Sequence, residues 1–131
     1  MRSGSLAMQW AALVGVILVL TGLVGFLDNP LVGKASGALV PTNELHNVVH
    51  IATGLVALWI AFGTKGLAQA NAVIGFGVLY AVVLVATLVS PDLFGLFAGY
   101  STNFAEHIIH GGVAAVSLIV GWMARSSLAT A

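Results

Sequence analysis

All four histidines of this chain lie in two short segments that resemble each other. His46 and His50 stand four residues apart in the first segment, and Glu106 and His110 stand four apart in the second. Side chains at this spacing share one face of an α-helix. Imidazole and carboxylate groups suit zinc, iron, copper or nickel, and four such ligands make a closed tetrahedral zinc site. If two such helices face each other, the spacing predicts a metal site built from His46, His50, Glu106 and His110.

A haem or a chlorophyll-type pigment is the second kind of ligand that paired histidines hold. Haem iron commonly takes an axial histidine, and His50 and His110 would then stand on opposite faces of the ring. Small residues leave flat space beside each helix, at Gly54 after His50 and at Gly111 and Gly112 directly after His110. A hydrogen-bonded clasp of histidine and glutamate between helices, without any ligand, is the structural alternative.

The composition places these segments in a membrane protein. Sixty per cent of the 131 residues are hydrophobic and 6 % are charged, whereas soluble domains carry about a quarter charged residues. Four lysines and arginines provide no basic surface for nucleic acid, and the absence of cysteine excludes thiolate metal ligands. The sequence contains no nucleophile motif, phosphate loop or dinucleotide fingerprint. We therefore expect no catalytic residue.

Four apolar stretches are long enough to cross a bilayer, which takes about 20 residues. Backbone groups in lipid must be satisfied within the span, so each stretch must be helical. We read the first stretch as a retained helix, because it is longer than the apolar region of a secretory signal. The expected fold is all-α, an integral membrane four-helix bundle that forms one domain over residues 1–131. The predicted spans are Met8–Leu27, Leu45–Gly63, Leu67–Val89 and His107–Ala124.

The two histidine segments belong to a weak internal repeat. A shift of 60 residues superimposes Asn43 on Asn103 and His50 on His110. Each unit would be one helical hairpin, and two crossings per unit leave both copies pointing the same way. Small residues follow each histidine along its helix face, and such residues let helices approach closely in lipid. We therefore expect the second and fourth spans to pack against each other. The predicted units cover about residues 8–65 and 68–125.

Charge placement predicts the orientation of the bundle. Four spans put both termini and the connection between the second and third spans on one side. That side holds Arg2, Lys65 and Arg125, whereas the other side holds Lys34. The positive-inside rule assigns the more basic side to the cytoplasm. We therefore expect both termini in the cytoplasm and the histidines near the outer face.

Three segments carry a resemblance to a known family: QWAALVG at 9–15, HNVVH at 46–50 and NFAEHIIH at 103–110. They resemble a bacterial membrane family catalogued as domain of unknown function 4383, and the similarity covers nearly the whole chain. In the family pattern the position of Glu106 is usually aspartate and His107 is not characteristic, which favours Glu106 over His107 as a site residue. The resemblance implies this fold in the bacterial inner (cell) membrane, and it implies no activity.

Three functions agree with these observations. The first is a non-enzymatic subunit of a larger membrane complex, with lipid and other membrane proteins as partners, that holds a metal ion or tetrapyrrole between the second and fourth spans. The second is a structural or assembly subunit whose histidines and glutamate form a clasp without a ligand. The third is a quinone-reactive or redox membrane enzyme. Because a small apolar chain has few surfaces for independent chemistry, we expect the binding subunit.

Overall fold

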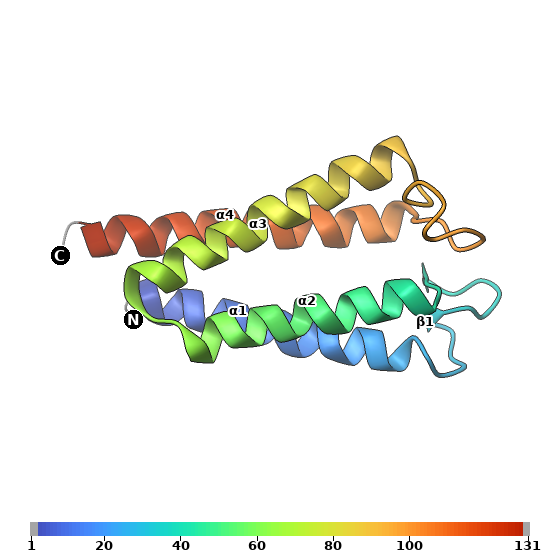
Figure 1. Ribbon diagram of the computed structural model, residues 1–131, viewed down its shortest axis with the longest axis horizontal. Coiled ribbons are helices and arrows are strands. Elements are labelled where there is room, and N and C mark those ends of the chain that lie inside the picture. Colours follow the sequence, from blue (N-terminus) through green and yellow to red (C-terminus); the bar gives the residue numbers. More distant parts are fainter. Residues whose placement is uncertain (1–2, 130–131) are drawn as a thin grey trace.

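The computed structural model describes residues 3–129, with side chains from Leu6 to Leu128, and arranges them as four long helices (Figure 1). All four helices are long and apolar enough to cross a membrane. The expected four-helix membrane bundle is therefore confirmed. In chain order the elements are α1 (Ser3–Val24), β1 (Val32–Gly33), β2 (Val40–Pro41), α2 (Glu44–Gly63), α3 (Gly66–Val89) and α4 (Phe104–Ala129).

Four helix boundaries differ from the predicted spans by more than one residue. Helix α1 begins at Ser3 and α4 ends at Ala129, each five residues beyond the predicted span. Helix α1 ends at Val24, three residues before the predicted end, because the chain tightens into a turn in which the Leu27 N–H donates to the Val24 carbonyl (2.9 Å). Helix α4 begins at Phe104, three residues before the predicted start. Asn103 caps it there, since its Oδ1 accepts a hydrogen bond from the Glu106 N–H (3.1 Å). The cap places Glu106 in the first turn of α4.

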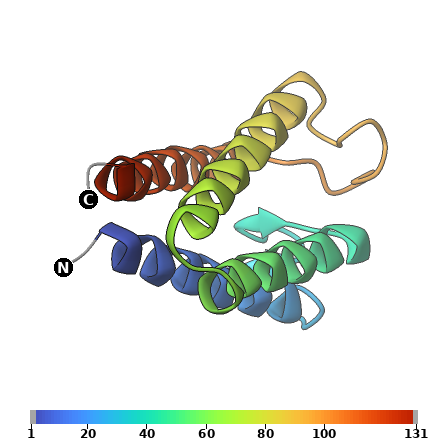
Figure 2. The same cartoon turned by 60° about the vertical axis from the view of Figure 1, so that its left-hand side comes forward.

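The bundle consists of two helical hairpins, α1–α2 and α3–α4, which Figures 1 and 2 show from two sides. Glycine lets the helices of each hairpin approach closely. A Cβ atom built on Gly54 of α2 would lie 2.8 Å from the Val19 amide nitrogen and 2.9 Å from the Gly15 carbonyl oxygen of α1. A Cβ atom on Gly121 of α4 would lie 2.9 Å from the Ile74 amide nitrogen of α3. The backbones of each pair are therefore nearly in contact.

The expected packing of the second span against the fourth is wrong. Helix α1 makes the main contact with α4 between the hairpins, and α2 hardly approaches the backbone of α4. Small residues permit close approach but do not specify the partner, and here Gly54 and Gly121 contact the other helix of their own hairpin. Ala57 and Ser117 are nevertheless buried at the centre of the bundle. The Trp10 indole N–H reaches between the hairpins and donates to Ser117 Oγ (2.8 Å).

The two loops at the end opposite the termini are tied to each other. Asn43 caps α2 by accepting a hydrogen bond from the His46 N–H (2.9 Å), and its Nδ2 donates to the Leu96 carbonyl of the other hairpin (2.9 Å). Asn103, which caps α4, donates in turn to the Leu39 carbonyl of the first hairpin (2.9 Å). The two asparagines are 60 residues apart, so positions matched by the repeat make matching contacts. The duplication itself stays a prediction.

Candidate metal centre

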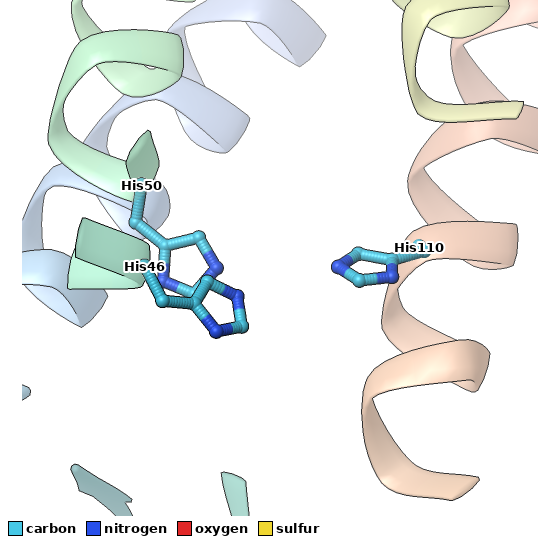
Figure 3. Close-up of side chains that lie close together, drawn as sticks. All are labelled: His46, His50 and His110. Atoms are coloured by element: carbon cyan, nitrogen blue, oxygen red, sulfur yellow. The ribbon is translucent and has the colours of Figure 1, made fainter. Parts of the chain in front are cut away.

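Three histidines converge at the loop end of the bundle. His46 and His50 lie on the first two turns of α2, and His110 on α4 points toward them across the space between the two helices (Figure 3). One ring nitrogen from each histidine lies within 4.8 Å of the others. The side chains are buried, with exposed fractions of 2 %, 7 % and 4 %. The α2 and α4 backbones stand apart here, and the imidazoles reach into the space between them.

This separation is close to that of ligands on one ion. Nitrogens bound to zinc at about 2.0–2.1 Å in a tetrahedral site stand about 3.4 Å from one another. The three histidine nitrogens lie within 4.8 Å of one another. Each ring would therefore have to move by about one ångström for all three nitrogens to coordinate one ion. The geometry suits an ion held by imidazoles from two helices.

Glu106 stands beside the histidines rather than among them. Its Oε1 lies 3.3 Å from Nε2 of His46, and the residue is 1 % exposed. The predicted four ligands are thus brought to one region, with the three imidazoles closest together and the carboxylate next to His46. A carboxylate at this position offsets part of the charge of a bound cation.

Several buried polar atoms at and near this cluster make no hydrogen bond. Within the described residues, the unpartnered buried side-chain atoms are the two Glu106 oxygens and the Nδ1 atoms of His46, His50, His107 and His110. Elsewhere in the described part of the chain, buried polar side chains such as Gln69 and Ser117 do have partners. Buried polar groups in proteins are almost always hydrogen-bonded, because desolvation without a partner is costly. The concentration of unpartnered atoms at this end of the bundle sets Glu106 and the histidines apart from the other buried polar groups of the described residues.

Two aromatic side chains lie against the histidine rings, and neither was predicted from the sequence. Phe97, from the loop between α3 and α4, stacks on His46 with ring centroids 4.1 Å apart and an interplanar angle of 5°. Tyr80 of α3 lies with its ring centroid 5.9 Å from that of His110, and its hydroxyl is 3.2 Å from Thr53 Oγ1. No spacing points to Phe97. Tyr80 does carry a signal in the sequence, since a tyrosine inside a membrane span needs a hydrogen-bond partner for its hydroxyl.

The glycines expected to leave room for a tetrapyrrole lie in different surroundings. Helix α1 occupies the space beside Gly54, and a Cβ atom on Gly111 would lie 3.5 Å from the Leu84 side chain. A Cβ atom on Gly112 would meet no other atom within 4 Å. The ring centroid of His46 lies 4.4 Å from that of His50. The three glycines therefore do not border one common open space.

Fold and site together define a small four-helix membrane-type protein with a buried cluster of three histidines. The chain belongs to the family described as Domain of unknown function (DUF4383), which matches residues 9–123. The resemblance seen in the histidine segments is thereby confirmed, and the matched region contains His46, His50, Glu106 and His110. Comparison with curated proteins and with solved structures finds no match.

Proposed function

We propose that the protein holds one transition metal ion inside the membrane bundle through His46, His50 and His110, with Glu106 as the neighbouring anionic partner. The observation that carries the proposal is the set of unpartnered buried atoms on these four residues. Neutral imidazole is a ligand for zinc, copper, iron and nickel. Three imidazoles leave the charge of a divalent ion uncompensated in a low-dielectric site, and the Glu106 carboxylate offsets part of it.

The proposed role is binding rather than catalysis, as one subunit of a larger complex in the bacterial inner membrane. Large apolar side chains outside the helices support a partner, since Leu31 and Leu39 in the first loop and Phe94 in the second are all exposed. Exposed apolar groups that cluster at one end of a protein mark an interaction surface. The ion would then hold the two hairpins together at the end where this surface lies.

Elemental analysis of untagged protein, purified in a mild detergent, tests the metal proposal. We expect about one transition metal ion per chain, removal of the ion by a strong chelator, and a lower unfolding temperature after removal. The tag is omitted because a polyhistidine tag would itself bind metal. A visible absorption band of a porphyrin or chlorin would instead support a tetrapyrrole. Colourless protein that carries no metal, and takes up none when titrated with Zn²⁺, would leave the histidine and glutamate clasp as the function.

We also propose that both termini lie in the cytoplasm and the histidine end faces outward. Lys34, the basic side chain at that end, forms an ion pair with Glu44, and the hydrogen bond to this carboxylate raises the pKa of the Lys34 ammonium group. The positive-inside rule counts lysines and arginines, and Arg2, Lys65 and Arg125 on the side of the termini outnumber Lys34. A cysteine placed at Ser36 should react with a membrane-impermeant maleimide on intact cells, and one at Leu128 should react only after lysis. The reverse labelling pattern would refute the orientation.

A further inference from the structure

A second feature of the histidine region is a cavity of about 260 Å³ between α1 and α4. Its walls are mostly apolar side chains of the two helices, together with Thr21, and Val32 of β1 and Val40 of β2 line it at the loop end of the bundle. His50, Glu106 and His110 form a polar side of the cavity. The volume lies just below the roughly 300 Å³ at which small-molecule pockets begin, so the cavity fits a ring-sized group rather than a whole lipid.

The mouth of this cavity faces the surface that the bilayer would cover. Leu13 and Ile17 of α1 and Ile109 of α4 line the cavity and are exposed, and all three lie within predicted membrane-spanning helices. Exposed apolar side chains at this depth contact lipid tails. A ligand would therefore enter sideways from the membrane, with its polar part toward Glu106 and any apolar tail left in the lipid.

The lining restricts the chemistry of that ligand. Among the described residues, no lysine or arginine lines the cavity, so a phosphate headgroup finds no cation there. A fatty acid would bury its carboxylate where no cation of the described residues pairs with it, and burial of an unpaired carboxylate is costly. Glu106 instead offers unpartnered acceptor oxygens, and an imidazole can donate through a ring N–H. A neutral, flat ring that carries carbonyl or hydroxyl oxygens needs no cation, brings no carboxylate, and can form hydrogen bonds with Glu106 and the imidazoles. The Trp10 indole provides an aromatic wall for such a ring.

We propose that this cavity binds the ring of a lipid-soluble quinone or quinol, with its tail passing between α1 and α4 into the bilayer. Imidazole N–H groups would donate to the carbonyl oxygens of the quinone, and Glu106 would accept from a hydroxyl of the quinol. This inference goes beyond the metal proposal, because the cavity and its polar side exist whether or not an ion is bound. The two sites share His50, Glu106 and His110, so the ring would sit directly beside the ion.

Fluorescence of Trp10 reports on this binding. The chain has three tryptophans, and Trp59 and Trp122 are exposed and do not line the cavity. In lipid nanodiscs of a W59F/W122F variant, decylubiquinone should quench Trp10 in a saturable manner, with one site per chain, and decanol should not compete. Ile17→Phe narrows the mouth and should weaken binding by about tenfold, as overpacking of a fitted site does. Val16→Phe, an equally exposed neighbour that does not line the cavity, should leave binding unchanged.

Three results would overturn the proposal. The first is quenching that rises in proportion to the quinone content of the membrane and is equal in Ile17→Phe and Val16→Phe. Such quenching would indicate collision rather than binding. Decanol could compete as well as the quinone, so that the tail alone is recognised. Native mass spectrometry could find a phospholipid retained by the unsubstituted protein and lost from Ile17→Phe. The titration is repeated after chelator treatment, and saturable quenching of metal-free protein would uphold this site even if the elemental analysis refutes the metal.

Discussion

Alanine at His50 or at His110 is expected to abolish metal binding by the purified protein. The two residues lie on different helices, and their nitrogens, with that of His46, form the group of closely spaced ligand atoms found in the described residues. Removing either one leaves at most two imidazoles, both of which must still be desolvated. Loss of a partner outside the first coordination shell already costs about 10–100-fold in metal affinity, so loss of a ligand should cost more than about 100-fold.

Competition with a chelating dye for Zn²⁺, measured in detergent, checks this result. His107→Ala is the matched control, because His107 lies on the same helix near the site but outside the group of three, and it should keep the affinity of the unsubstituted protein. His46→Ala separates the two kinds of ligand. It should remove an ion but leave a tetrapyrrole, which needs only the axial pair. Unchanged Zn²⁺ affinity in both His50→Ala and His110→Ala would exclude the proposed centre.

The number of helices and their approximate positions were predictable because lipid leaves the backbone no other choice. A span of apolar residues must satisfy its own hydrogen bonds, so hydropathy alone located all four helices, with boundaries that differ by at most five residues. The exact starts depend on polar capping side chains, and Asn103 moved the start of α4 into a segment that hydropathy excludes. Capping depends on hydrogen bonds from polar side chains, which a search for long apolar stretches does not consider.

The choice of helix partners was not predictable in the same way. A face of small residues predicts that another helix packs closely against it, but it does not identify that helix. Gly54 shows this, since it lies on the small-residue face assigned to α4 and in fact contacts α1. The interface between α1 and α4 contains a long-range hydrogen bond from Trp10 to Ser117, two residues 107 positions apart that no local pattern connects.

The candidate site was predictable where it depended on helical spacing. His46 and His50 share a face because they are four residues apart, and the 60-residue shift brought His110 into the same cluster. The stacking of Phe97 on His46 was not predictable, because Phe97 belongs to an irregular loop where Leu93 and Phe94 both adopt positive φ (50° and 58°). Such conformations follow from the tertiary contacts of the loop and leave no periodic trace in the sequence.

The close approach of α1 and α2 gives Gly54→Leu a large expected effect on stability. A Cβ atom at Gly54 would already stand 2.8 Å from the Val19 amide nitrogen and 2.9 Å from the Gly15 carbonyl oxygen, and backbone atoms cannot rotate away. The helices must separate, which should lower the free energy of unfolding by about 3 kcal/mol, at the upper end of typical overpacking costs. The shift of α2 should also weaken Zn²⁺ binding, since His50 lies one turn before Gly54 on the same helix.

Gly75→Leu is the matched control for this effect. Gly75 follows Gly15 by 60 residues, lies inside α3, and a Cβ atom there would meet no other atom within 4 Å. Leucine is also a better helix former than glycine by roughly 0.5–1 kcal/mol, so this variant should match or slightly exceed the stability of the unsubstituted protein. Unfolding in mixed detergent micelles, followed by circular dichroism, compares the two variants. Equal stability of Gly54→Leu and Gly75→Leu would mean that α1 and α2 are not packed backbone to backbone, and the positions of His46 and His50 would then have to be fixed by the loop contacts of Asn43 and Phe97 alone.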